Sequence, residues 1–359
     1  MSRPKFISVL RQVIGWLLLV SLTGCGTLSY YYQAISGQMH LLVNRRGLDR
    51  VLLSESVNPA LKERIVLARR ITEFAERELG LPVGNTFSSY VDVGSPYLLW
   101  NVFAAPEFSL TLKTFCYPIA GCVSYKGYFS AESAAKFSAT LADQGLDTFS
   151  GGVAAYSTLG WFADPLLNTY IDRNDTQLAA LIFHELAHKV VYIPGDTRFN
   201  ESFATAVEQA ALRRWLQVDK ASAALEDYQL TEQHRSQVLT LIAEARTELE
   251  TVYNSAETDK VKREQKMQVI ASLKADYWAL AANWNSGQVF ADWMASDINN
   301  AMLGAVADYN DWVEYFEIWL ASLDGDLPVF FRGVKQLANL DDAERALFLN
   351  RLTGQRIPE

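Results

Sequence analysis

The chain of 359 residues carries 41 acidic and 32 basic side chains, which gives a formal net charge of −9 at pH 7. This excess of negative charge argues against nucleic acid as a partner and against electrostatic docking to anionic lipid. Half of the residues are apolar and 12% are aromatic, so the chain can bury a sizeable core, which we expect to be divided between two lobes.

The N-terminus is typical of an export signal. Three basic residues precede an uncharged run over residues 13–24, which is shorter than the roughly twenty residues that span a bilayer. The run ends in LTGCG, which resembles the lipobox of bacterial lipoproteins, where the cysteine, here Cys25, is lipidated and becomes the first residue of the mature chain. An ordinary signal peptide or a short anchor is the alternative. We therefore expect a lipid anchor in the cell envelope, and the glycine after the cysteine resembles the signal for the periplasmic face of the outer membrane.

Residues 25–130 are expected to form helices and a small β-sheet. Residues 30–53 and 59–79 favour helices. Residues 86–123 are rich in Phe, Tyr, Val, Thr and Ser, interrupted by Gly and Pro, and favour short strands. The second helix carries its apolar side chains at helical spacing, at Ile65, Ala68, Ile71, Phe74 and Ala75.

This region contains all three cysteines of the chain, Cys25, Cys116 and Cys122. If Cys25 is acylated, Cys116 and Cys122 remain as an even pair, which fits an oxidising compartment. Pro118 and Gly121 between them favour a tight turn. We therefore predict a disulfide, with free thiols or metal ligands as the alternatives.

Residues 131–217 are expected to form a catalytic core. Residues 151–162 alternate or run apolar and predict a strand, which lies either in the core or at an edge where it pairs with an extended substrate. Asn174, with Gln177 three residues later, predicts the start of a helix.

The central motif of that helix is HELAH at residues 184–188. Residues four apart lie on one face of a helix, so the imidazoles of His184 and His188 can bind one metal ion. Glu185 lies beside them, and its carboxylate can take a proton from a water whose pKa is lowered to about 7 by Zn²⁺. The alternative is a pair of helix histidines that cap the helix or pair with carboxylates. The apolar residues around the motif favour a dry metal site.

A catalytic zinc ion needs a third protein ligand. No histidine follows at metzincin spacing, and Glu201 is the best candidate. It lies in a second predicted helix, after a break at residues 194–197 in which Asp196 or Thr197 serves as N-cap. Twelve residues separate His188 from Glu201, which is enough for the chain to turn back and bring Glu201 to the histidine face.

The HELAH motif followed by Asn-Glu on a second helix resembles the gluzincin arrangement of zinc peptidases. The longer stretches AYSTLGWF, FHELAH and FNESFAT resemble the putative aminopeptidase family of bacterial membrane lipoproteins. The resemblance implies a peptide substrate, a Zn²⁺ cofactor with His184, His188 and Glu201 as ligands, and Glu185 as the catalytic base. The sequence departs from the thermolysin pattern at Thr205, where that pattern has an Asp that orients a ligand histidine.

Four further residues are candidates for the site. A peptidase needs a donor to the oxyanion that forms on the scissile carbonyl, and Tyr156 and Tyr309 are candidates for this donor. Glu208 lies two turns after Glu201 on the same helix face, about 10 Å along the axis, where it can meet the substrate amine or a ligand histidine; a solvent-facing glutamate is the alternative. Asn300, at a predicted helix start, can bind substrate backbone, although such asparagines are usually helix caps.

Residues 218–359 are strongly helical and charged, and we expect them to form a helical lobe. Two apolar stripes are separated by a polar break at residues 255–259, which predicts an antiparallel pair of helices. The stripes are Val238, Ile242, Ala245, Leu249 and Val252 in the first helix, and Met267, Ile270, Leu273, Tyr277 and Leu280 in the second.

Together these patterns predict an α+β fold that is predominantly helical, with a zincin-like catalytic lobe containing a small β-sheet and a second, helical lobe. The predicted function is a zinc-dependent peptidase, which the resemblance specifies as an aminopeptidase. An envelope endopeptidase and a catalytically inactive structural lipoprotein are the alternatives.

Overall fold

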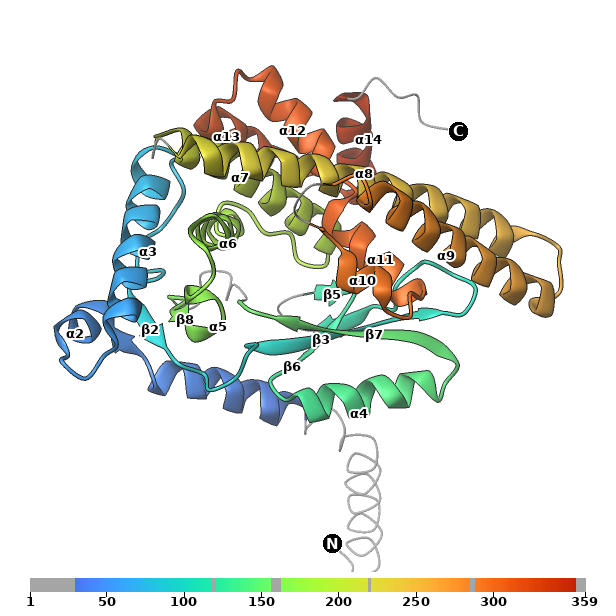
Figure 1. The fold of residues 1–359 in the computed structure, drawn as a ribbon, viewed down its shortest axis with the longest axis horizontal. Helices are drawn as coiled ribbons and strands as arrows, with labels where there is room; N and C mark the ends of the chain where they lie inside the picture. Colours follow the sequence, from blue (N-terminus) through green and yellow to red (C-terminus); the bar gives the residue numbers. More distant parts are fainter. Residues whose placement is uncertain (1–29, 118–120, 156–162, 219–220, 285–287, 353–359) are drawn as a thin grey trace, which may run out of the picture.

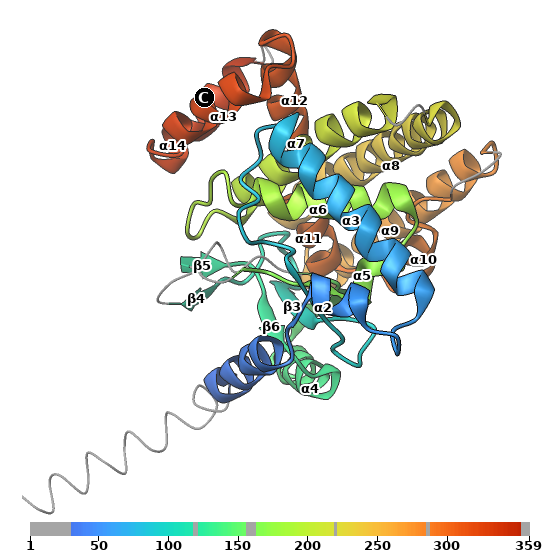
Figure 2. The ribbon, with the colours of Figure 1, turned by 90° about the vertical axis from the view of Figure 1, so that its left-hand side faces the viewer.

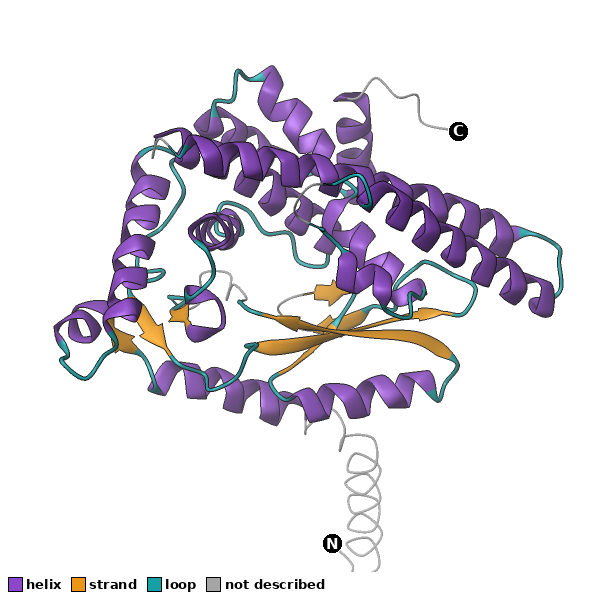
Figure 3. Ribbon diagram, viewed as in Figure 1, coloured by secondary structure: helices purple, strands orange, loops and turns teal. Residues whose placement is uncertain are grey.

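The computed structural model describes residues 30–117, 121–155, 163–218, 221–284 and 288–352. The fold is α+β and predominantly helical, as predicted (Figures 1 and 3). The strands are β1 (Arg46–Gly47), β2 (Ser89–Val91), β3 (Leu99–Pro106), β4 (Phe115–Tyr117), β5 (Gly121–Val123), β6 (Lys126–Tyr128), β7 (Leu146–Val153) and β8 (Leu166–Leu167). After a helical segment at 30–43, the helices are α2 (Leu48–Leu53), α3 (Pro59–Arg77), α4 (Ala131–Ala142), α5 (Asn168–Ile171), α6 (Asp175–Ala187), α7 (Thr197–Val218), α8 (Ser222–Asn254), α9 (Asp259–Ala281), α10 (Ala291–Ala295), α11 (Asn300–Asn310), α12 (Val313–Ser322), α13 (Leu327–Leu337) and α14 (Asp342–Leu352).

The sheet with the longest strands has the order β6-β3-β7, and both pairings are antiparallel. Alternate side chains of β3 point to opposite faces, since successive residues of a strand do so. Val102 and Ala104 pack with α4, whereas Phe103 and Ala105 pack with α11. The segment 30–43 and α4 therefore lie on one side of the sheet, and α8 to α11 lie on the other (Figures 1 and 2).

The largest hydrophobic core surrounds α6 and α7 and includes α3, α12 and α13. The apolar stripe predicted for α3 is buried: none of its five side chains is more than 8% exposed. In α7, Phe199 and Phe203 pack on Phe316 of α12 with ring centroids 5.3 and 5.7 Å apart. Each such fully buried ring contributes about 1.5–3 kcal/mol, so the two helices that carry the metal motif are held in the most strongly packed part of the molecule.

Helices α8 and α9 form the predicted antiparallel pair, and the chain reverses at residues 255–258. The stripe predicted in α8 is buried. The stripe predicted in α9 is wrong at Met267, which is 63% exposed; the buried line runs through Val269, Leu273 and Tyr277. Positions 267 and 269 differ by about 200° around a helix, so burial of one leaves the other in solvent.

The N-terminal region differs from prediction at one break. The helix predicted over 30–53 is interrupted, because residues 46–47 form β1 and pair with β2.

The strand predicted at 151–162 begins earlier, at Leu146, and its residues 156–162 lie outside the described ones. Within the described part of the chain, no helix is both long and apolar enough to cross a membrane.

Candidate metal centre and substrate cleft

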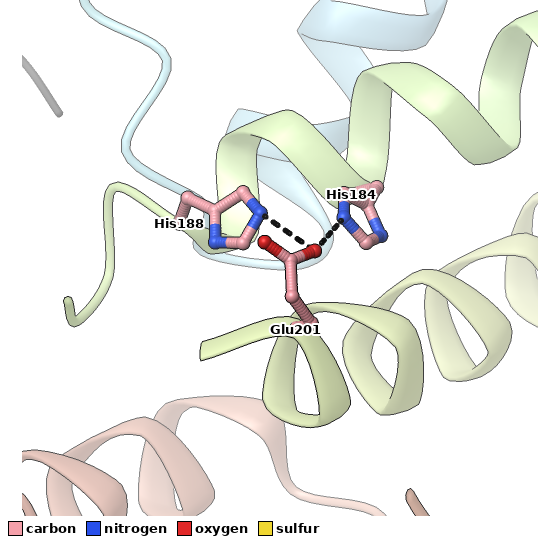
Figure 4. Close-up of side chains that lie close together, drawn as sticks. All are labelled: His184, His188 and Glu201. Atoms are coloured by element: carbon pink, nitrogen blue, oxygen red, sulfur yellow. Dashed lines mark hydrogen bonds and ion pairs between the residues drawn. The ribbon is translucent and has the colours of Figure 1, made fainter. Parts of the chain in front are cut away.

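Helix α6 carries both histidines of the motif at its C-terminal end. Its start is capped as predicted: the Asn174 side chain accepts a hydrogen bond from the backbone N–H of Gln177 at 2.8 Å. Most of its apolar side chains, such as Leu178, are fully buried in the main core. His184 and His188 are thereby turned toward α7 (Figure 4).

The turn between α6 and α7 is locked by the buried Asn200. Its amide nitrogen donates to the carbonyl of Ile193 and its oxygen accepts from the N–H of the same residue, both at 2.8 Å. Asp196, one of the two predicted N-caps, accepts from a backbone N–H in the first turn of α7 at 3.0 Å. Its other oxygen accepts from the buried guanidinium of Arg345 at 2.8 Å. These contacts fix the start of α7 and so place Glu201 opposite the histidines.

The three predicted ligands meet in one place. Oε2 of Glu201 lies 3.3 Å from Nε2 of His184 and 3.7 Å from Nε2 of His188 (Figure 4). One ligand atom of each residue lies within 4.8 Å of the other two. Two ligand atoms at about 2.0–2.1 Å from a tetrahedral zinc ion are separated by about 3.3 Å. The donor set and its spacing therefore fit a zinc ion with three protein ligands.

Burial and neighbouring charges set the protonation of the metal-free site. Burial acts to lower the pKa of His184, but the carboxylates of Glu201 and Glu208 outweigh it and raise this pKa well above its ordinary value. Burial dominates at His188 and lowers its pKa to about 4. Burial opposes ionisation of Glu201, but His188 and His184 hold its pKa below the ordinary value. A metal ion held here would therefore meet an ionised Glu201 and a neutral His188, and its binding would require His184 to lose a proton.

Glu208 makes a hydrogen bond to His184, one of the three predicted ligands. Its Oε2 lies 3.0 Å from Nδ1 of His184, on the side of the ring away from Glu201. A histidine that donates Nδ1–H to a carboxylate presents the lone pair of Nε2 to a metal ion. Glu208 is one helical turn after Thr205, so it supplies the partner that the Thr205 position lacks. Nδ1 of His188, by contrast, is buried and has no hydrogen-bond partner among the described residues.

Glu185 lies beside the histidines with one oxygen, Oε2, buried and without a hydrogen-bond partner among the described residues. Burial is the main cause that raises the pKa of its carboxyl to about 7. Behind it lies a cavity of about 20 Å³, also lined by Arg45 and Asp164, which is large enough for one water molecule. A carboxylate with a pKa near neutrality is suited to exchange protons with a reacting group.

A cleft of about 990 Å³ opens in front of Glu185 and is lined by β7 and the residues after it, and by α6, α8 and α11. His184, Glu185 and Glu208 line it together with Tyr309 of α11. Burial, and after it the charge of Glu201, raises the pKa of Tyr309 well above its ordinary value. Its phenol therefore stays protonated at neutral pH and can act as a hydrogen-bond donor in the cleft.

A disulfide joins Cys116 and Cys122, as predicted. The two cysteines stand opposite each other in the antiparallel hairpin β4-β5. The hairpin contacts the turn between the metal helices: a Cβ at Gly121 would lie 2.7 Å from the backbone nitrogen of Gly195 and 2.9 Å from the carbonyl carbon of Pro194. Gly121 also has a φ of +75°, so both the close approach and the backbone angle require glycine here.

Comparison with known proteins assigns the chain to a family. The sequence model of a family described as putative aminopeptidase matches residues 29–349. The chain belongs to the putative aminopeptidase family. Comparisons with curated proteins and with solved structures find no match. The match covers the hairpin, both metal helices and every described wall of the cleft, and it confirms the family resemblance seen in the motifs. The gluzincin arrangement and the lipid anchor stay predictions.

One predicted substrate residue of this family member has another role. Asn300 is fully buried at the start of α11, and its side-chain nitrogen donates to the carbonyls of Pro106 at 3.0 Å and Glu107 at 2.8 Å. Its oxygen accepts from the hydroxyl of Tyr253 at 2.7 Å. Both amide hydrogens are used inside the protein, so Asn300 joins β3, α8 and α11 and does not reach substrate. The capping role falls to Asn299 instead.

Two tyrosines that lie near the predicted ligands were not predicted from the sequence as site residues. Tyr125 and Tyr192 have raised pKa values, first because they are buried and then because the charge of Glu201 is near. The chain has 16 tyrosines, and only the tertiary structure separates these two from the rest. Of the other predicted residues, Tyr156 and Cys25 lie outside the described ones.

Proposed function

We propose that this family member is a zinc-dependent peptidase of the bacterial cell envelope, and in the first place an aminopeptidase. The proposal is carried by the convergence of His184, His188 and Glu201 beside Glu185 at the wall of a cleft. Two imidazoles and one carboxylate form the ligand set of catalytic zinc sites that keep one position open.

Zinc held by these residues would polarise the scissile carbonyl and lower the pKa of a water molecule to about 7. Glu208 keeps Nε2 of His184 directed at the ion through the hydrogen bond at Nδ1. Glu185 takes the proton of the attacking water and passes it to the leaving amine. Its pKa of about 7 suits it to both transfers.

Tyr309 is the proposed donor to the oxyanion that forms on the scissile carbonyl. It lines the cleft with Glu185, and its phenol is protonated at neutral pH. A fixed donor to a developing oxyanion lowers the barrier, and loss of one such donor typically costs about 10²-fold to 10³-fold in rate.

The strand β7 is the proposed docking edge for the substrate backbone. Among the described strands it pairs only with β3, and Gly151, Gly152 and Val153 line the cleft. An exposed strand edge offers its free N–H and C=O groups to an extended peptide. A peptide added there runs along the cleft and past Glu185.

An endopeptidase is the second candidate, favoured by the charges in the cleft. An aminopeptidase needs a carboxylate for the substrate α-ammonium, and the carboxylates that line the described part of the cleft are Glu185 and Glu208. Glu208 is bound to His184. Arg173 and Arg235 are the cations of the same lining, and they suit acidic substrate groups better than an amine.

The proposed location is the periplasmic face of the outer membrane, with Cys25 acylated as the anchor. The lipobox-like LTGCG supports this placement. The disulfide between Cys116 and Cys122 supports an oxidising compartment.

The first experiment measures the zinc content of the purified protein and of Glu201→Ala by elemental analysis. We expect one zinc per chain in the wild type and a large loss in the variant. Glu185→Gln is expected to keep the metal and to lose about 10²-fold to 10⁴-fold in peptide hydrolysis. Full activity in Glu185→Gln sinks the mechanism, and a folded wild type that takes up no zinc on reconstitution favours an inactive lipoprotein. Cleavage of N-acetylated peptides would indicate an endopeptidase, because an aminopeptidase requires a free N-terminus on its substrate.

A further inference from the structure

The helical segment 30–43 packs on the protein with one face and carries exposed apolar side chains on the opposite face. Its inner face contacts the protein through Tyr30, Gln33, Gly37 and Leu41, which follow one another at intervals of three and four residues. The Gln33 side chain accepts from the backbone N–H of Phe129 at 2.9 Å, and Leu41 is only 4% exposed. A Cβ at Gly37 would lie 2.3 Å from the ring of Phe129, so the helix axis approaches the body closely there. The inner face is therefore fixed in place.

The outer face repeats the same spacing with large apolar side chains. Tyr32, Ile35, Met39 and Val43 are 75%, 62%, 50% and 74% exposed. At 100° per residue the mean direction of this row lies roughly 160° from that of the inner face. A helix with a second apolar stripe on its far side has a second apolar environment to meet.

The neighbouring helix α4 does not share the exposed apolar row of segment 30–43. Helix α4 lies on the same side of the sheet as the segment 30–43 (Figures 1 and 2). Its exposed side chains include the ion pair of Lys136 with Glu132 at 2.6 Å, and Thr140. One helix of the layer thus shows an ordinary solvated face and the other an apolar one.

We propose that the outer face of segment 30–43, the row Tyr32, Ile35, Met39 and Val43, lies in the interface of the lipid bilayer. The inference rests on the proposed acylation of Cys25. Only residues 26–29 separate this cysteine from the segment, and five residue steps span at most about 18 Å. An acylated Cys25 therefore holds the segment at the membrane surface, where a row of apolar side chains on a helix parallel to the surface enters the headgroup boundary.

The attraction is apolar and not electrostatic. Removal of residues 1–24, which carry three basic and no acidic side chains, would change the net charge from −9 to about −12, and this charge repels an anionic surface. Burial of apolar area contributes about 25 cal/mol per Å², and salt does not screen this contribution as it screens charge interactions. Contact through this face should therefore persist in high salt.

This contact would orient the proposed active site. The segment 30–43 and the Val102 side of β3 face the membrane, whereas the cleft is lined by Phe103 and by residues of α11 on the other face of the sheet. The cleft then opens away from the bilayer, which favours soluble peptides of the periplasm as substrates over membrane-embedded chains.

Spin labelling of the full chain in phospholipid vesicles tests the proposal. With Cys25 acylated and Cys116–Cys122 oxidised, a cysteine introduced by Met39→Cys is the free thiol that takes the label. Met267→Cys on α9 is the matched control, since Met267 is 63% exposed and lies in another layer. We expect the ratio of collisions with oxygen to collisions with a water-soluble nickel chelate to be several-fold higher at position 39 than at position 267, and to be unchanged in high salt.

Each outcome bears on the proposal. Added to the labelled position 39 protein, Ile35→Glu should return the label toward the ratio of the control without detaching the protein. If the protein floats with the vesicles but the label at position 39 gives the same collision ratio as the control, the proposed membrane contact of the outer face is refuted, whereas the lipid anchor at Cys25 is supported. If the protein does not float with the vesicles at all, both the lipid anchor and the membrane contact of segment 30–43 are refuted. A ratio that collapses in high salt refutes the apolar basis of the contact.

Discussion

Loss of the carboxylate at Glu208 should weaken the metal site without removing a ligand. Glu208 accepts from Nδ1 of His184 at 3.0 Å, and the two side chains are only 25% and 18% exposed. In Glu208→Ala the imidazole loses the partner that fixes its ring and its tautomer. Such partners are worth about 10-fold to 100-fold in metal affinity or activity, which corresponds to about 1.4–2.8 kcal/mol.

The assay is zinc competition against a chromophoric chelator, followed by kcat/KM for peptide hydrolysis with zinc in excess. Glu208→Gln should lose less affinity than Glu208→Ala, because the amide keeps a hydrogen-bond acceptor but no charge. Gln209→Ala is the matched control, since Gln209 is the next residue on α7 and its side chain donates to Glu232 and not to a ligand. A Glu208→Ala protein with the zinc affinity of the Gln209→Ala protein would show that the hydrogen bond at His184 has no part in metal binding.

Four further predictions concern protons, core contacts and the hairpin. Zinc uptake near pH 7 should release about one proton from His184, measurable by calorimetry in buffers of different ionisation enthalpy. Because the pKa of His184 is raised, the metal-free protein has this stabilisation in full below the unfolded pKa and loses it as pH rises through the raised value, so its melting temperature should fall on the alkaline side. Asn300→Ala should lower the free energy of unfolding in urea by about 1–3 kcal/mol while KM of the folded enzyme stays unchanged; a large rise in KM would restore its role in substrate binding. Replacing Cys116 and Cys122 by Ser should cost about 2 kcal/mol by loss of the short loop closure, and an unchanged urea midpoint would contradict this.

The convergence of His184, His188 and Glu201 was predictable because the sequence information for it is local. The spacing of His184 and His188 is a property of one helix, and Glu201 follows after a single turn. The cap at Asn174 was predictable for the same reason, since the donor lies three residues away. Short-range rules of this kind hold wherever the tertiary structure does not override them.

Contacts between distant parts of the chain were not predictable. The guanidinium of Arg345 reaches Asp196 across 149 positions, and no local pattern marks it. Asn299 and Asn300 are adjacent and chemically identical, yet one caps α11 and the other is buried between three elements. Only the packing of β3 and α8 decides which asparagine faces inward.

The contact between Gly121 and the turn at Pro194 and Gly195 has a consequence for the timing of maturation. At Gly121 the backbone of the hairpin lies close to the backbone of the turn between α6 and α7, and a disulfide joins the two strands of the hairpin. A reduced chain carries His184, His188 and Glu201 but lacks the covalent bond that holds the hairpin closed. If the protein is exported as proposed, the support that the hairpin gives to this turn would become covalent only after the chain reaches an oxidising compartment.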